Sequence, residues 1–154
     1  MEIPEDIETL SNERLEEAKI LFDNKKYDGA FYLSGYSVEL ALKAKIARQF
    51  GVPNLFTNDE KGLKGIDGVA SIRTVIKTHN LFTLLILSGL KEKFDLDKSK
   101  MENVSLSLSN SLFFQKWSEQ WRYMPCGSMG ETECKKLLEL LLDKKGILEW
   151  IKHN

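Results

Sequence analysis

The chain has 154 residues, with 22 Lys and Arg against 23 Asp and Glu, so its formal net charge is −1. A balance this close to zero gives no general attraction to nucleic acid or to an anionic membrane. The chain is 42% hydrophobic and 29% charged, which is typical of a globular domain with one core. Two His and two Cys at distant positions exclude a zinc finger.

Two further expectations concern location and redox state. No apolar run is long enough to cross a bilayer, so we expect no membrane span. Cys126 and Cys134 could form one disulfide, but in a chain without a secretory leader they are expected to be reduced thiols. Both points favour a cytoplasmic protein without a metal or another cofactor.

The charges are unevenly distributed along the chain. Residues 1–24 carry eight acids and two bases, a net of −6, and the other 130 residues carry +5. A solvated acidic helix face explains this segment without a function. Alternatively, an acidic first helix faces away from a mildly basic body, which leaves any anion site on the remainder of the chain.

The first two segments are predicted to be long helices. Residues 5–24 place apolar side chains at helical spacing, and residues 26–50 contain no Pro and end at Gly51. In the second segment, the polar side chains form one narrow stripe and apolar or small residues cover the rest. The stripe consists of Asp28, Tyr32, Glu39 and Lys43. Such a helix should lie at the centre of the fold.

Shorter elements follow. Residues 51–70 are rich in Gly and predict a long flexible loop, and a helical turn is expected at about 70–77. Thr78 has the position of an N-cap for a short helix that ends near Ser88.

Two more long helices are predicted in the second half. Residues 98–124 contain neither Pro nor Gly, although 104–109 alternate as a strand would. Ser128 and Glu131 have the spacing of a capping box for a final helix, whose apolar side runs from Cys134 to Leu148. The sequence thus predicts a single all-α domain over 1–154, an up-and-down bundle of four long helices and one or two short ones.

Few polar residues are candidates for a site. His79, at a helix start, is either a surface residue or a base or donor. Arg122 lies beside Tyr123 and near Trp117 and Trp121, a set that could stack a base and hold a phosphate. Alternatively, both indoles belong to the core and Arg122 caps a helix or pairs with Glu39.

The remaining candidates have simpler interpretations. Glu39 and Lys43 form an i,i+4 pair, which stabilises an exposed helix by only a few tenths of a kcal/mol. Neither cysteine has the partners of a nucleophilic thiol.

In their order and spacing, several motifs resemble the HEPN domain family (higher eukaryotes and prokaryotes nucleotide-binding). They are Lys26-Tyr27-Asp28 through Tyr32, Gly35-Tyr36 through Ala44, Thr78-His79-Asn80-Leu81, and Trp117-x-x-x-Trp121-Arg122-Tyr123. The resemblance implies an all-α fold, dimerisation, and a cleft with Glu39, His79, Arg122 and Tyr123 around it. It also implies a role in defence, in toxin–antitoxin pairs or beside a nucleotidyltransferase.

Ribonucleases of this family carry an Arg and a His with four to six residues between them. Arg122 matches the Arg, but Gly127, Ser128 and Met129 occupy the three places for the His. We therefore expect a non-catalytic homodimeric module that binds a nucleotide, RNA or a protein partner, with Glu39, Lys43, His79, Arg122 and Tyr123 as candidate ligand contacts. The alternatives are a degenerate metal-independent ribonuclease that uses Arg122 and His79, and a structural adaptor for a nucleotidyltransferase-type partner.

Overall fold

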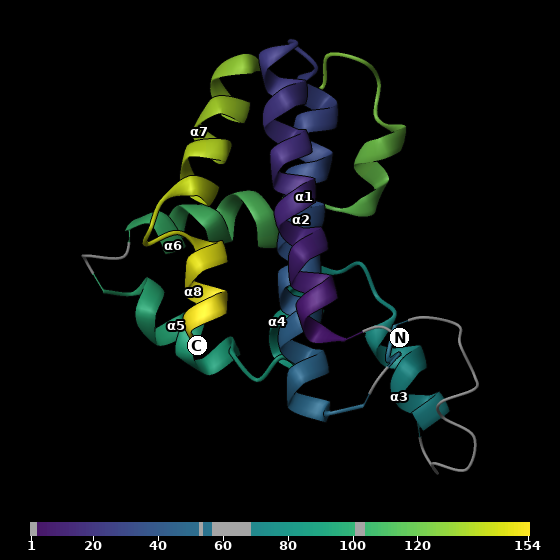
Figure 1. Cartoon of the computed structure of the whole chain (residues 1–154). Helices are drawn as coiled ribbons and strands as arrows, with labels where there is room; N and C mark the ends of the chain where they lie inside the picture. Colours follow the sequence, from purple (N-terminus) through teal and green to yellow (C-terminus); the bar gives the residue numbers. More distant parts are fainter. Residues whose placement is uncertain (1–2, 53, 57–68, 101–103) are drawn as a thin grey trace.

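A computed structural model describes residues 3–52, 54–56, 69–100 and 104–154 (Figure 1). Most of the loop predicted at 51–70 lies outside these residues. Within them the chain is helical and no strand occurs, so the predicted all-α class is confirmed. No helix in this part of the chain is both long and apolar enough to cross a membrane.

The first two predicted helices are confirmed, and they form an antiparallel hairpin (Figure 1). These are α1 (Pro4–Asp23) and α2 (Tyr27–Phe50), and Gly51 ends α2 with a left-handed φ of 63°. Where the helices cross, the buried hydroxyls of Ser11 and Ser37 each donate to the other residue's carbonyl, at 2.7 and 2.8 Å. Small side chains and reciprocal hydrogen bonds thus hold the two backbones close together.

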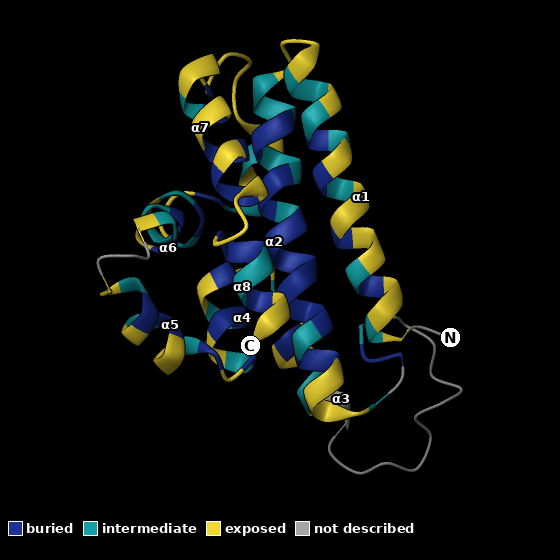
Figure 2. Cartoon of the chain, turned by 60° about the vertical axis from the view of Figure 1, so that its left-hand side comes forward, coloured by how far each residue is buried: buried dark blue, intermediate teal, exposed yellow. Residues whose placement is uncertain are grey.

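Helix α2 lies at the centre of the fold, as predicted. Most of its middle is buried, whereas α1 is exposed along one side (Figure 2). It contacts α1, α4 (Leu81–Leu87), α7 (Glu131–Leu142) and α8 (Ile147–His153). Small buried residues such as Ala30, Gly35 and Ala41 permit close approach of these neighbours.

The short helices form where they were predicted, but the N-cap of α4 is a different residue. Helix α3 (Val69–Ile76) forms where a helical turn was predicted. The N-cap of α4 is Asn80, whose side chain accepts from the Thr83 amide at 2.9 Å. The prediction of Thr78 as the cap was therefore wrong: the Thr78 hydroxyl accepts from the Asn80 amide and shapes the turn before the helix.

The predicted helix over 98–124 is broken into several pieces. It comprises the end of α5 (Lys91–Lys98), α6 (Val104–Ser109), the π-helix η3 (Asn110–Phe114) and the 3₁₀-helix η4 (Glu119–Tyr123). Residues 115–118 leave the helical path without Pro or Gly. Here Trp117 packs directly on Gly35 of α2, and its indole N–H donates to the Tyr32 carbonyl at 3.1 Å. Tertiary packing of this indole overrides helix propensity.

The last predicted helix is also divided. α7 ends at Leu142, and α8 begins at Ile147 after a tight turn in which a Cβ on Gly146 would lie 2.1 Å from the Leu140 carbonyl oxygen. The capping box was wrong as well, because the N-cap of α7 is Gly130 and the Ser128 hydroxyl donates to the Pro125 carbonyl. The turn lets α8 pack against the lower half of α2 (Figure 1).

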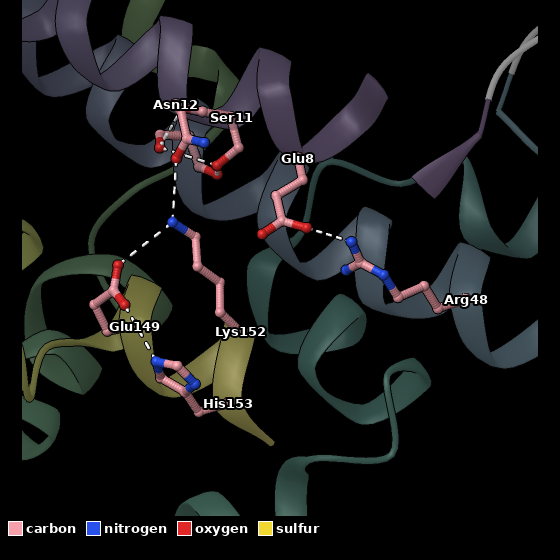
Figure 3. A network of polar contacts seen from close by, with 8 residues as sticks. Glu8, Ser11, Asn12, Arg48, Glu149, Lys152 and His153 are labelled. Carbon is pink, nitrogen blue, oxygen red and sulfur yellow. Dashed lines mark hydrogen bonds and ion pairs between the residues drawn. The ribbon is translucent and has the colours of Figure 1, made fainter. Parts of the chain in front are cut away.

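Polar contacts tie the helices together at the surface. Arg48 of α2 pairs with Glu8 of α1, and Lys152 of α8 donates to Asn12 of α1 at 3.2 Å (Figure 3). Asp97 of α5 accepts from the Trp150 indole at 2.9 Å, and this bond, with two neighbouring lysines, holds the pKa of the carboxyl well below its usual range. These contacts fix α5 and α8 relative to the hairpin.

Gly35 gives a direct test of this packing. A Cβ at this position would lie 2.1 Å from the Trp117 indole nitrogen. We expect Gly35→Ala to destabilise the fold by about 2 kcal/mol, although Ala favours helices over Gly, because overpacking outweighs propensity. Urea unfolding would measure the free energy. Gly130→Ala is the control, since no atom lies within 4 Å of its Cβ. Equal or greater stability of Gly35→Ala would show that Trp117 does not pack there.

Candidate functional site

A buried carboxylate organises the polar centre of the molecule. Glu39 lies in the middle of α2, is 1% exposed, and accepts two hydrogen bonds at Oε1. The donors are Lys43 Nζ at 2.7 Å, one turn further along α2, and His79 Nδ1 at 2.9 Å, from the segment between α3 and α4. The sequence singled out all three residues, and the structure brings them together as one centre.

Burial changes the meaning of the Glu39–Lys43 pair. The sequence predicted an exposed salt bridge of little energetic weight, but the two side chains are only 1% and 11% exposed. Removing charges from water is costly, so each depends on the other for compensation. Lys43 Nζ also lies 5.3 Å from the centre of the Phe56 ring, a favourable position for a cation.

Glu39 has one oxygen left over. Its Oε2 is buried and has no hydrogen-bond partner among the residues that the structure describes. A carboxylate oxygen in this state retains unused capacity to accept a hydrogen bond. The centre is therefore polar enough to hold a further donor.

His79 presents its second ring nitrogen outside the centre. Because a carboxylate only accepts, Nδ1 carries the proton in the bond to Glu39, and Nε2 is left as the acceptor of a neutral ring. The side chain is half-exposed, and within the described parts of the chain Nε2 has no partner. A ring oriented by a buried carboxylate is ready to accept a proton or, when cationic, to donate to an anion.

Aromatic rings continue the site along α2. The Tyr32 and Tyr36 rings are stacked with centroids 6.4 Å apart, and Trp117 stacks on Tyr32 at 6.1 Å. Burial, followed by the negative charge of Glu39, raises the pKa of Tyr36, so its phenol stays protonated. The sequence analysis placed Tyr36 with the apolar residues, yet its position one turn from both Tyr32 and Glu39 indicated the same face.

Arg122 and Tyr123 lie apart from these contacts. Both are exposed on η4, and the Arg122 guanidinium lies over the Tyr123 ring, 5.0 Å from its centroid. Arg122 does not pair with Glu39, whose partners are Lys43 and His79. In the described structure no hydrogen bond or ion pair joins Arg122 or Tyr123 to the centre.

The two nearby indoles are structural. Trp117 is buried in the main core, and Trp121 packs edge-on against Phe31 with centroids 4.5 Å apart. Trp121 is half-buried and packs against the edge of this core. The core interpretation is therefore confirmed for Trp117 and holds only in part for Trp121.

Residues at the positions where the family's His would stand have structural roles. The Asp28 carboxylate accepts from the amides of Gly127 and Met129, each at 2.7 Å. Gly127 has a left-handed φ of 87°, and the Met129 side chain is buried. Sequence analysis placed Asp28 only on the polar stripe and missed this role, since no pattern links residues a hundred positions apart.

The cysteines and the acidic side chains were also considered as a reactive thiol or a metal site. Both thiols are free, and burial raises the pKa of Cys134 to about 11, which keeps it protonated and unreactive. Across the described ranges, no three His, Cys, Asp or Glu side chains form a group that could hold a metal ion.

The buried pair makes a stability prediction. Glu39→Gln leaves the Lys43 ammonium without a counter-charge, so we expect a loss of about 3 kcal/mol in unfolding free energy. The double variant Glu39→Leu, Lys43→Met removes both charges and should recover most of that loss.

Urea unfolding of both variants measures these energies. Glu16→Gln is the control, because it breaks the exposed pair with Lys19 and should change stability by about 0.5 kcal/mol or less. A double variant no more stable than Glu39→Gln would contradict the energetic account of the pair.

Comparison with known proteins gives one finding. The family model of the HEPN domain matches residues 9–57, which cover most of α1 and all of α2, including Glu39 and Lys43. No curated protein and no solved structure gives a significant match. The match suggests a function related to nucleotides or RNA, and HEPN domains commonly dimerise. The HEPN resemblance seen in the sequence is thus confirmed by a family-model match over residues 9–57.

Proposed function

We propose that the protein is a non-catalytic HEPN-like module that binds a nucleotide, free or as part of RNA, through a phosphate held by His79. The centre formed by Glu39, Lys43 and His79 carries this proposal. The HEPN match over α1 and α2 supports the class of ligand. The lack of a His at the motif's spacing from Arg122 supports binding in place of cleavage.

The charges of the centre explain why a phosphate would bind there. Glu39 and Lys43 compensate each other, so a neutral His79 leaves the three residues with no net charge. A phosphate favours the ring that donates from both nitrogens, which is cationic. The centre then carries +1 against the bound anion, while Glu39 keeps the ring oriented.

Arg122 and Tyr123 form a second part of the proposal. The guanidinium is exposed and, among the described residues, has no acidic partner. An Arg beside an aromatic ring is suited to contact a further phosphate and base of an RNA strand. We therefore assign these residues to the binding of longer ligands and the His79 centre to a single nucleotide.

The family also supports a proposal for the oligomeric state and the biological context of the protein. HEPN domains commonly dimerise, and we extend this to a homodimer here. A toxin–antitoxin or defence system, or a nucleotidyltransferase-type partner, is the proposed context. Light scattering after size exclusion would test the dimer directly.

One observation favours a second candidate function. The Glu39–His79 bond is the arrangement of a carboxylate that orients a general base, so a degenerate metal-independent ribonuclease is the alternative. It would require Arg122 of one subunit to act beside His79 of a second subunit in a dimer. Cleavage of RNA in the presence of EDTA by the wild type, abolished in His79→Ala, would support this function and overturn the non-catalytic one.

Calorimetric titration tests the favoured function. We expect adenosine 5′-monophosphate to bind the wild type about 10 to 100-fold more tightly than it binds His79→Ala, since one charged hydrogen bond is lost. Arg122→Ala should bind this mononucleotide as the wild type does and should lose affinity only for a short single-stranded RNA.

His153→Ala is the matched control, because this exposed imidazole lies at the C-terminal end of α8 and pairs only with Glu149 in the described structure. Equal binding by the wild type and His79→Ala would overturn the assignment of the phosphate to this centre.

A further inference from the structure

A pocket of about 390 Å³ opens beside the Glu39 centre, between the first half of α1 and α2. Its walls are a separate small apolar cluster of Ile7 and Leu40, flanked by the rings of Tyr36 and Phe56. Lys43 lines the pocket and also holds Glu39, so the pocket and the centre share one side chain.

The polar groups of the pocket are few and opposite in kind. Lys43 offers an ammonium whose charge Glu39 already compensates. Asp6 is exposed on α1, and its carboxylate has no hydrogen-bond partner in the described structure. A ligand here meets one charged donor and one charged acceptor among side chains that are otherwise apolar or aromatic.

The opposite charges of Lys43 and Asp6 favour a neutral ligand over an anionic one. An apolar acid would bring its anion toward an ammonium that is already neutralised and toward the Asp6 carboxylate, so it is disfavoured. A neutral planar ring could contact the aromatic walls and satisfy both polar groups through a ring acceptor and an amino donor. A nucleobase has this combination, and its stacking on one aromatic side chain stabilises binding by about 1–3 kcal/mol.

We infer that this pocket binds the base of the nucleotide, between Tyr36 and Phe56, while its phosphate lies at His79. The inference rests on the proposed function and adds the site that recognises the base. Lys43 Nζ and His79 Nδ1 bond to the same carboxylate oxygen, so the two ends of the ligand would lie on adjacent parts of one site.

The test separates the base from the phosphate with three probes. They are adenosine 5′-monophosphate, adenosine and ribose 5-phosphate, each titrated calorimetrically into the full chain. Leu10→Trp fills the pocket from its rim, where Leu10 is 47% exposed. Ile20→Trp is the control, because Ile20 is exposed on the same helix and does not line the pocket.

We expect the wild type to bind the mononucleotide at least about tenfold more tightly than ribose 5-phosphate, as one stacked base implies. Leu10→Trp should abolish this difference and leave ribose 5-phosphate binding unchanged, and Ile20→Trp should match the wild type. If Leu10→Trp fails to fold, Phe56→Leu, which removes one ring and keeps an apolar side chain, should weaken the mononucleotide and adenosine equally.

The other outcomes overturn distinct claims. If His79→Ala weakens the mononucleotide but the pocket variants do not, the proposed function stands and the base pocket is wrong. If adenosine binds and responds to the pocket variants while the phosphate adds no affinity, the base pocket stands and the phosphate site is wrong. If none of the three probes binds the wild type, both are wrong.

Discussion

The geometry of the site depends on a buried ion, the carboxylate of Glu39 in the middle of the central helix. A carboxylate at this depth must be compensated, which constrains Lys43 one turn away and draws His79 in from the segment before α4. The same helix packs against α1, α4, α7 and α8. Glu39 is thus held by its two hydrogen-bond donors, and α2, which carries it, is held by its neighbouring helices. The geometry of the centre is therefore set before a ligand binds.

A fixed centre is useful for recognition because little has to be ordered on binding. The imidazole of His79 is oriented by the buried Glu39 carboxylate, and the phenol of Tyr36, one helical turn from Glu39, remains protonated. By contrast, Arg122 and Tyr123 are exposed on a short 3₁₀-helix. The two parts therefore suit different tasks: a precise contact with one nucleotide, and a more adaptable contact with a longer strand.

Sequence patterns predicted the first half of the fold well, because α1 and α2 are long and periodic and α2 ends at Gly51. They failed where one distant contact decides the local structure. Trp117 leaves its helix because Gly35 of α2 offers a place for its ring, and Gly146 permits a turn that divides the last helix. Neither the contact between Trp117 and Gly35 nor the turn at Gly146 can be predicted from residues adjacent in the sequence.

The candidate site, too, could be predicted only in part, because it depends on contacts between residues distant in the sequence. Glu39, Lys43 and His79 were each found from local spacing, but their meeting at one oxygen required the three-dimensional path from α2 to α4. Tyr36 was missed because an aromatic side chain in an apolar segment looks like core until a pocket is seen beside it. Phe56 was missed because it lies in a segment predicted to be a loop. Asp28 was noticed only as part of a stripe, although it fixes the segment where the family's His would stand.

The central claim is that His79 binds phosphate while Glu39 holds its other nitrogen. Imidazole ¹⁵N spectra would test it most directly, because the chain contains only two His and His153 serves as an internal reference. During titration with adenosine 5′-monophosphate, His79 Nε2 should change from an unprotonated to a protonated nitrogen while Nδ1 stays protonated and His153 is unaffected. An unchanged His79 spectrum at saturating nucleotide would contradict the account.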